Sequence, residues 1–378
     1  MNERNFLHPF PPTLTRIKFG RGVLDDLGKH TREVGGAALL VCGHGSARST
    51  GVLARAVKSL EAAGVRTTVF EAAAPDSDTV DRVADQARAA GAEVIVGIGG
   101  GSVLDTAKAA AVAFAHGPSG PLVGTVPPPH PDTLPVVAVP TTAGSGSEVT
   151  KGAIITDTGR ALKSGIRGID LFPKIALVDP SLTDTQPAGV ALASGFDAIT
   201  HAIEALAARN GRPLTDEIAR QALGILPDTL RRLAAGDTGS EVRDRMAYGA
   251  VLGGTLVASA STCLPHRMQQ AMGTPDRPGP SHGQGLALLY PAWLESLDKV
   301  VPQAATRIAD ALHTDNPREA IARLLADIGL RRSLRSAGYG PDDIPGFVSR
   351  ITGNTSNDPH PTPDNDLITS IYERALQI

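Results

Sequence analysis

The sequence predicts an α/β domain in the first half of the chain and an all-helical domain in the second half. Short apolar runs alternate with Ala-rich amphipathic stretches up to about residue 180, the rhythm of βαβ units around a parallel sheet. After about residue 183 strand-like runs mostly vanish and long helical patterns follow. The length of 378 residues also favours two domains, because single cores stop growing at roughly 250–300 residues. We expect domains at residues 1–182 and 183–378.

The elements of both halves can be assigned from their apolar patterns. The predicted buried strands are residues 37–43, 65–70, 93–100, 135–140 and 175–179, and the predicted helices between them are 50–63 and 78–90. A Pro/Gly-rich stretch at 117–134 is expected to be a surface loop. The predicted helices of the second half are 188–208, 214–234, 240–260, 298–313 and 316–328.

Composition excludes several classes of protein. The chain has 36 Lys and Arg against 39 Asp and Glu, a net charge of −3, which argues against a nucleic-acid binder with a basic footprint. Cys42 and Cys263 are the two cysteines, which excludes a disulfide scaffold and suits a reducing cytosol. The N-terminus lacks an apolar signal-peptide core, and no run approaches the ~20 apolar residues of a membrane span. We therefore expect a cytoplasmic protein with no membrane or nucleic-acid partner.

A glycine-rich loop follows the predicted strand 93–100. Gly99, Gly100 and Gly101 would let the backbone approach a phosphate closely and adopt positive φ. Ser102 would open a helix whose N-terminal amides can hold an anion. The loop matches neither the GxGxxG fingerprint nor a P-loop, so a plain tight turn is the alternative.

A second loop, PTTAGSGSEVT at residues 140–150, follows the next predicted strand. It is dense in hydroxyls and glycines. Ligands of open α/β sheets bind at the carboxyl ends of strands, so two such loops on one edge favour a nucleotide pyrophosphate and its sugar. Taken alone, this loop could equally be a hydroxyl-capped turn.

Acidic and imidazole side chains in the second half suggest a metal site. Asp197 and His201 are four residues apart in a predicted helix, so they share one helix face. His266 and His282 lie on other segments of the same half. Three imidazoles and a carboxylate suit Fe²⁺ or Zn²⁺, and the lack of a nearby thiolate is compatible with iron(II). The alternative is an ordinary Asp–His pair on a helix surface.

Together these motifs resemble the iron-containing (group III) alcohol dehydrogenase family, which includes lactaldehyde reductase, butanol dehydrogenase and maleylacetate reductase. The similarity covers essentially the whole chain. It rests on FGRG (19–22), GIGGGSVLDTAK (97–108), VPTTAGSGSEVT (139–150), ALVDPSL (176–182), GFDAITHAIEA (195–205) and the HG of 282–283. The resemblance implies a Rossmann-like NAD(P)-binding domain and an all-α metal-binding domain, in the dehydroquinate synthase-like fold.

The resemblance also implies roles for individual residues. The positions that match the family's four metal ligands, which also carry its catalysis, are Asp197, His201, His266 and His282. The positions that match its nucleotide-contacting residues are Gly99, Gly100, Gly101, Ser102, Asp105, Thr141, Thr142, Ser147, Lys163 and Leu182. The implied reaction is reversible hydride transfer between a nicotinamide and a metal-polarised carbonyl. The implied assembly is a homodimer or a larger homo-oligomer.

Three features depart from the family pattern. Many NAD-using members have an Asp where this chain has Gly43, with Arg48 nearby. A glycine removes the repulsion of a 2′-phosphate and an Arg could pair with it, so we expect NADP(H) to be preferred over NAD(H). The alternative is a tight turn at Gly43 and tolerance of both nucleotides.

The other two departures concern the substrate. Gln270 stands where many family reductases have a His that could relay protons, and an amide cannot act as an acid or base near neutral pH. The loop between Gly273 and His282 is slightly longer than is usual in the family and carries Arg277. We expect Arg267 and Arg277 to be solvated. The alternative is that one of them adds positive charge near the substrate, which would favour a carboxylate or phosphonate.

Two other functions are compatible with the sequence. A dehydroquinate synthase-like lyase would use NAD without net redox change, and a non-catalytic relative would bind the nucleotide without turnover. Net consumption of NAD(P)H discriminates between them and a reductase.

Overall fold

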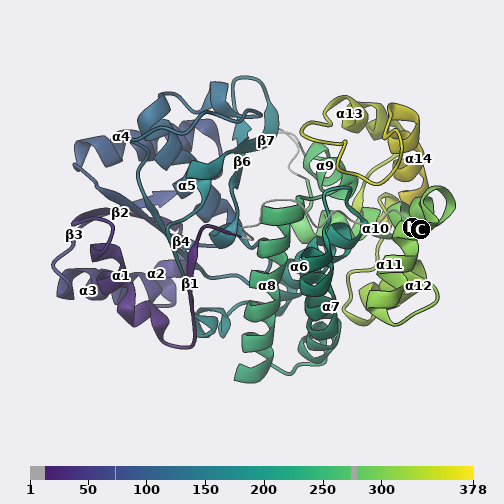
Figure 1. Cartoon of the computed structure of the whole chain (residues 1–378), viewed down its shortest axis with the longest axis horizontal. Coiled ribbons are helices and arrows are strands. Elements are labelled where there is room, and N and C mark those ends of the chain that lie inside the picture. Colours follow the sequence, from purple (N-terminus) through teal and green to yellow (C-terminus); the bar gives the residue numbers. More distant parts are fainter. Residues whose placement is uncertain (1–12, 73, 274–278) are drawn as a thin grey trace. The chain divides into compact units, whose positions relative to one another are not determined.

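A computed structural model of the chain describes residues 13–72, 74–273 and 279–378. It contains two compact units, Thr13–Gln186 and Pro187–Ile378, which we call the α/β unit and the helical unit (Figure 1). The first holds a parallel sheet covered by helices and the second is built from helices. The predicted fold class is therefore confirmed.

The main sheet has six strands in the order β1-β8-β5-β4-β2-β3, with every neighbouring pair parallel. The strands are β1 (Arg16–Phe19), β2 (Ala37–Gly43), β3 (Arg66–Ala72), β4 (Val94–Gly99), β5 (Val136–Pro140) and β8 (Ile175–Val178). Five of them correspond to the predicted strands, and β1 was not predicted.

Both faces of this sheet are buried, which explains the continuous apolar runs that mark its strands. Along β2, Leu39 and Val41 belong to one core, whereas Leu40 and Cys42 belong to the other. The first core contains residues of α4 (Ser77–Ala89) and α5 (Gly101–His116), and the second contains residues of α1 (Leu27–Arg32) and α3 (Val52–Ala62). The short helix α2 (Ser46–Ser49) follows β2 directly.

A separate antiparallel hairpin of β6 (Gly152–Asp157) and β7 (Leu162–Arg167) completes the α/β unit. The sequence analysis did not predict it. The predicted loop at 117–134 contains one short 3₁₀ helix, Gly120–Leu122, and is otherwise irregular.

The helical unit begins with α6, a long helix with almost every side chain buried. Its helices are α6 (Ala188–Ala207), α7 (Pro213–Ala234), α8 (Ser240–Ala260), α9 (Leu264–Ala271), α10 (His282–Val300), α11 (Pro302–Leu312), α12 (Pro317–Asp327), α13 (Ile344–Ser349) and α14 (Asn365–Ala375). By length and composition α6 could cross a membrane, but 83% of its most apolar stretch is buried inside the protein. A buried core helix of a globular protein has this character.

Most of the helices predicted for this unit agree with the structure, and the exception has a local cause. The predicted helix 298–313 is two helices, because α10 ends at Val300 and α11 begins at Pro302. Helices α9, α10, α13 and α14 were not predicted.

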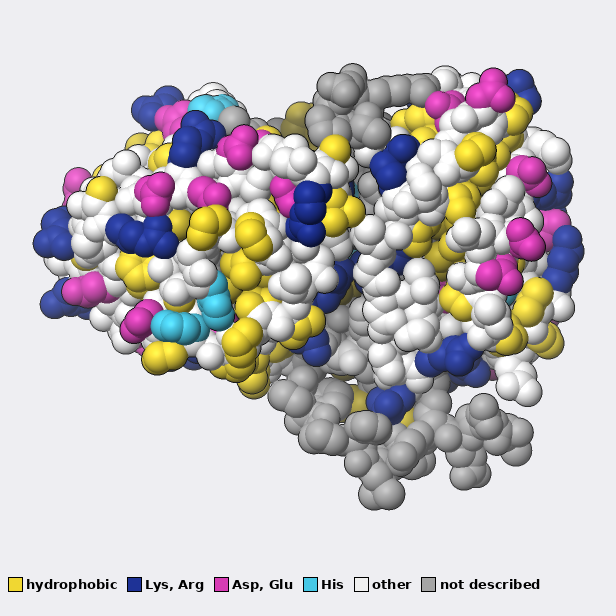
Figure 2. All heavy atoms as spheres, turned by 90° about the horizontal axis from the view of Figure 1, so that it is seen from above, with side chains coloured by type: hydrophobic (Ala, Val, Ile, Leu, Met, Phe, Trp, Pro, Cys, Tyr) yellow, Lys and Arg dark blue, Asp and Glu magenta, His cyan; other side chains and the backbone are white. Residues whose placement is uncertain are grey.

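On the face drawn in Figure 2, acidic and basic side chains are scattered among one another rather than gathered by sign.

Candidate metal centre and nucleotide site

Helix α6 carries three ionisable side chains on one buried face. Asp197, His201 and Glu204 follow one another at i, i+4 and i+7, which aligns them along the helix. These residues are 4%, 5% and 0% exposed. Because burying charged groups is unfavourable without partners, these residues require compensating contacts.

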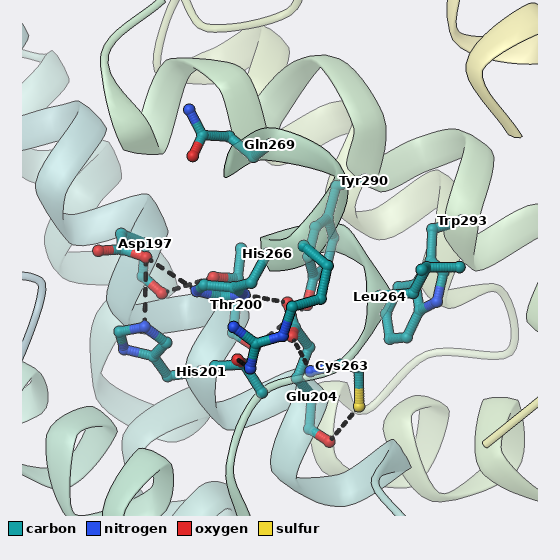
Figure 3. Close-up of polar contacts among 12 residues, drawn as sticks. Asp197, Thr200, His201, Glu204, Cys263, Leu264, His266, Gln269, Tyr290 and Trp293 are labelled. Carbon is teal, nitrogen blue, oxygen red and sulfur yellow. Dashed lines mark hydrogen bonds and ion pairs between the residues drawn. The ribbon is translucent and has the colours of Figure 1, made fainter. Parts of the chain in front are cut away.

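The nitrogens of three histidines converge on one oxygen of Asp197. The Nε2 atoms of His201, His266 and His282 lie 3.3, 3.4 and 3.4 Å from Asp197 Oδ1. One ligand atom each from Asp197, His266 and His282 can be chosen so that all lie within 4.8 Å of one another. In Figure 3 the His266 side chain lies between Asp197 and Glu204. The four predicted ligands are thus brought together within one unit.

Two of these converging atoms are buried without a hydrogen-bond partner among the described residues. They are Asp197 Oδ1 and His266 Nε2. Unsatisfied buried polar atoms are rare in proteins and call for an explanation. A carboxylate oxygen and imidazole nitrogens aimed at a common point form a suitable donor set for a divalent cation.

Two further side chains orient the histidines, and the sequence analysis missed both. His266 Nδ1 lies 2.8 Å from Glu204 Oε1, and His282 Nδ1 lies 2.5 Å from Gln269 Oε1. If Nδ1 is the protonated nitrogen of each ring and donates to its partner, Nε2 is unprotonated and its lone pair is available to a metal ion. Glu204 could have been found from the sequence, because its spacing from Asp197 places it on the same helix face.

The pKa values reflect this crowding. Burial would raise the pKa of Asp197, but His201, His282 and His266 outweigh burial and hold that pKa well below its ordinary value. Burial lowers the pKa of His201 to about 3. Burial opposes protonation of His266 as well, yet Glu204 and Asp197 raise its pKa to about 9. In the protein without an ion, the His266 ring is therefore in its protonated, positively charged form at neutral pH. A metal cation must displace that extra proton to bind.

Close packing of α10 on α6 places His282. A Cβ atom added to Gly283 would lie 1.9 Å from the backbone oxygen of Ala193. No side chain fits there, so the glycine after His282 lets the start of α10 lie directly on the α6 backbone.

The three candidate substrate residues fall in different places. Arg267 and Gln270 are on α9 and are 4% and 7% exposed. Arg267 donates a hydrogen bond to Thr262 Oγ1 at 2.9 Å, so the expectation that this arginine is solvated is wrong. Arg277 lies outside the described residues.

The glycine loop lies at the carboxyl end of β4, where α5 begins. A Cβ at Gly101 would lie 2.7 Å from Ser145 Oγ, and one at Gly99 would lie 2.6 Å from Val103 Cβ. None of Gly99, Gly100 and Gly101 has a positive φ, so the expectation of positive φ is wrong. Close approach, rather than a left-handed backbone, is what excludes side chains here.

The second loop meets the first at the same sheet edge. Strands β4 and β5 are paired up to Gly99 and Pro140, and the Thr141 amide donates to the Gly99 carbonyl at 2.9 Å. A Cβ at Gly100 would lie 3.2 Å from the side chain of Thr142. The two predicted nucleotide loops are therefore adjacent.

A buried polar cluster beneath these loops joins α5 to the chain that follows β5. Asp105 Oδ1 accepts a hydrogen bond from Ser147 Oγ at 2.5 Å, and Asp105 Oδ2 accepts from the Ile154 amide at 2.8 Å. Lys108 is fully buried and lies 3.4 Å from Asp105 Oδ1. Its Nζ donates to the carbonyl oxygens of Ser147, at 2.9 Å, and Gly152. Asp105 and Ser147 thus contact each other, and the sequence analysis missed Lys108.

The remaining candidate nucleotide residues lie around these loops. Lys163 is on β7, where burial lowers its pKa and nearby Asp105 opposes that shift. Gly43 ends β2, and Leu182 is 8% exposed and packs in the core that contains α3.

Known proteins resemble both halves of the chain. The model of "Iron-containing alcohol dehydrogenase" matches residues 14–180, and that of "Fe-containing alcohol dehydrogenase family, C-terminal" matches residues 191–376. A 1,3-propanediol dehydrogenase of Citrobacter freundii is 32% identical, covering 95% of this chain and 96% of that protein. A sulfoacetaldehyde reductase of Bilophila wadsworthia is 27% identical, covering 89% and 91%.

Solved structures extend this similarity to the fold. An archaeal halo-thermophilic alcohol dehydrogenase from a Red Sea brine pool superimposes with a TM-score of 0.91 at 28% identity, covering 100% of both chains. A 1,3-propanediol oxidoreductase superimposes with a TM-score of 0.88 at 29% identity, covering 95% and 97%. The chain belongs to the iron-containing alcohol dehydrogenase family and is an oxidoreductase acting on CH–OH groups.

Proposed function

We propose that this protein is a metal-dependent, NAD(P)H-linked reductase of small aldehydes or ketones that also oxidises the corresponding alcohols. The observation that carries the proposal is the convergence of three imidazole Nε2 atoms on Asp197 Oδ1. Two of the converging atoms are buried without hydrogen-bond partners among the described residues, so the site suits a cation. Neither the lyase nor the non-catalytic alternative gains support from a specific contact.

The proposed metal ligands are Asp197, His201, His266 and His282. We expect Fe²⁺ rather than Zn²⁺, because the chain belongs to the iron-containing family. A donor set of imidazoles and a carboxylate without a thiolate is compatible with iron(II). When bound, the ion would act as a Lewis acid that polarises a carbonyl oxygen. Glu204 and Gln269 keep the Nδ1 hydrogens of His266 and His282 turned away from the centre.

The α/β unit would bind the nucleotide at the edge formed by β4 and β5. Gly99–Ser102 and the first turn of α5 would hold the pyrophosphate, and Thr141, Thr142 and Lys163 would contact the rest of the nucleotide. Asp105 and Ser147 would position the second loop through their mutual hydrogen bond. Gly43 and Arg48 taken alone favour NADP(H). However, Arg48 forms an ion pair with Glu71, so its positive charge already has a partner other than a 2′-phosphate.

The substrate would be a small carbonyl compound. The relatives named above suggest hydroxyaldehydes and sulfonated aldehydes as test substrates. Buried Arg267 bonds within the helical unit, so Arg277 is the remaining candidate for binding an anionic substrate. Gln270 cannot relay a proton, so the alcohol proton would come through water or a cofactor hydroxyl. We expect the enzyme to act in the cytoplasm as a homodimer or a larger homo-oligomer.

The test is a turnover assay on protein purified without oxygen and reloaded with Fe²⁺ or Zn²⁺. Oxidation of NADH and NADPH is followed by absorbance against neutral, carboxylated, phosphonylated and sulfonated aldehydes. We expect turnover that requires the metal, and its loss in His266→Ala. The matched control is His130→Ala, which changes a histidine of the α/β unit outside the proposed site. Full activity of metal-free His266→Ala protein, or nucleotide binding without net oxidation, would contradict the proposal.

A further inference from the structure

The carboxyl ends of β2 and β3 extend the sheet edge that carries the glycine loop. Cys42 is paired with Ile98 of β4 on one side and with Glu71 of β3 on the other. A Cβ added to Gly43 would lie 3.4 Å from Val103 in the first turn of α5. Glu71 is therefore two strands from the glycine loop, along the edge where parallel sheets bind their ligands.

Two basic side chains hold the Glu71 carboxylate. Arg48 pairs with Glu71 Oε1, and His44 Nδ1 lies 3.3 Å from Glu71 Oε2. The Arg48 guanidinium holds the pKa of Glu71 below its ordinary value, so this group is ionised at neutral pH. Only 29% of the Glu71 side chain is exposed, against 68% for Arg48 and 60% for His44. Glu71 is therefore the least exposed member of the cluster.

A dinucleotide bound through Gly99–Ser102 would extend its adenosine half over the strand beside β4. Strand β4 lies between β5, which carries the second loop, and β2, which has β3 next to it. With the second loop assigned to the rest of the nucleotide, the adenosine half would lie on the β2 side. In nucleotide-binding sheets an acidic residue at this place accepts hydrogen bonds from the ribose hydroxyls of NAD, and an Arg accommodates the 2′-phosphate of NADP. Here both kinds of side chain are present and are bound to each other.

The pairing of Arg48 with Glu71 would affect the two nucleotides differently. A 2′-phosphate would have to take Arg48 away from Glu71 and would then lie beside an uncompensated carboxylate. A free ribose hydroxyl requires neither change, because it can donate to Glu71 while Arg48 stays paired. We infer that Glu71 is a specificity-determining residue that selects NAD(H) over NADP(H), with Arg48 and His44 holding its carboxylate in place. This inference rests on the proposed function and reverses the preference expected from Gly43.

The experiment compares the two nucleotides in two assays. Turnover with one aldehyde gives kcat/KM for NADH and NADPH, and the fluorescence of the reduced nucleotide gives Kd in metal-free protein. We expect the wild type to prefer NADH in both. Glu71→Gln removes the charge and frees Arg48, and should shift the NADPH/NADH ratio by at least about tenfold toward NADPH. Adding Arg48→Gln to that variant should reverse most of the gain.

A matched control is available in the same unit. Glu33 also pairs with an arginine, Arg16, and Arg16 begins β1, so this pair lies at the opposite edge of the sheet. Glu33→Gln should leave the NADPH/NADH ratio unchanged. A wild type that prefers NADPH, or a Glu71→Gln ratio equal to that of the wild type, overturns the inference while leaving the dehydrogenase intact. A wild type that neither binds nor oxidises either nucleotide overturns the proposed function itself.

Discussion

Glu204 Oε1 lies 2.8 Å from Nδ1 of His266, and both side chains are buried. The other carboxylate oxygen, Glu204 Oε2, accepts the Cys263 amide at 2.5 Å. One carboxylate thus fixes the ring of His266 and also the backbone just before α9, which carries that ring. Such outer contacts orient metal ligands and raise their basicity.

Replacing Glu204 by Gln should weaken metal binding. The amide keeps the size of the side chain but lacks the charge that favours the oriented imidazole, so we expect a loss of roughly 10–100-fold in metal affinity. Competition with a chromophoric chelator measures it, and circular dichroism checks the fold. Glu241→Gln, at an exposed ion pair of α8, is the control. Equal affinity in the wild type and Glu204→Gln would show that this contact does not support the centre.

Metal affinity should depend on pH through His266. Its pKa is raised to about 9, so at lower pH the ion must displace a proton. The apparent affinity should fall by about tenfold for each unit below that pKa, and approach a constant above it. Chelator competition across neutral and alkaline pH measures the slope. Asp197 is already ionised there, because its pKa is well below the ordinary value. An affinity independent of pH below 9 would contradict this prediction.

Glu295 should stabilise the helical unit at neutral pH. On α10 it contacts Lys299, Arg374 of α14 and Arg318 of α12 at 2.9, 2.8 and 2.7 Å. The contacts with Lys299 and Arg374, that with Lys299 most strongly, lower the pKa of Glu295 from 4.5 to about 2. A lowered folded pKa contributes stability that is fully present above 4.5 and is lost as the pH falls through about 2.

The substitution Glu295→Gln tests this network. We expect a loss of about 1 kcal/mol in the free energy of unfolding at neutral pH, measured by urea denaturation. The difference from wild type should shrink as the pH is lowered below 4.5. Glu319→Gln, whose ion pair is 59% exposed on both sides, should change stability less. A constant difference at all pH values would mean that charge is not the cause.

Lys108→Met should damage the α/β unit more than an ordinary surface change. It would leave the Asp105 carboxylate without its buried cation and the carbonyl oxygens of Ser147 and Gly152 without a donor. Breaking a buried pair in this way costs about 3–5 kcal/mol. Denaturation measures the loss, and nucleotide fluorescence should show weaker binding because the second loop loosens. Lys151→Met, an exposed position in the same segment, is the control. Equal stability of the two variants would contradict this role for Lys108.

Gly101→Ala should weaken nucleotide binding without unfolding the protein. The added methyl group would lie 2.7 Å from Ser145 Oγ, so the two loops must move apart. We expect a rise in Kd for the reduced nucleotide, measured by fluorescence. Gly224→Ala is a control, since nothing lies within 4 Å of its added Cβ. A Kd equal to that of the wild type would mean that the loops separate without consequence.

The sequence predicted those parts of the fold whose pattern is local. Strands such as β2 are continuous apolar runs because both of their faces are buried. The β6–β7 hairpin has no such run, so it was not predicted. Helix α10 contains Gly283, Gly285 and Pro291, which interrupt the apolar pattern by which a helix is predicted. The spacing of Asp197 and His201 indicated a shared face because both lie on one helix.

The contacts that depend on pairing between distant segments could not be predicted. Glu71 meets Arg48 only because β2 and β3 pair in a particular register, and the sequence does not state that register. Gln269 meets His282 across a stretch of chain with no regular pattern. Glu204, by contrast, could have been predicted, because its spacing from Asp197 places both residues on the same face of α6.

The contact of Gly283 with the Ala193 backbone constrains how this sequence can evolve. Any side chain at position 283 would push the start of α10 away from α6 and withdraw the imidazole of His282 with it. Selection on the histidine therefore acts equally on its neighbour, although the neighbour has no chemistry of its own. A protein that lost the glycine could no longer place the histidine at the metal centre. We therefore expect Gly283 and His282 to be retained or lost together during evolution.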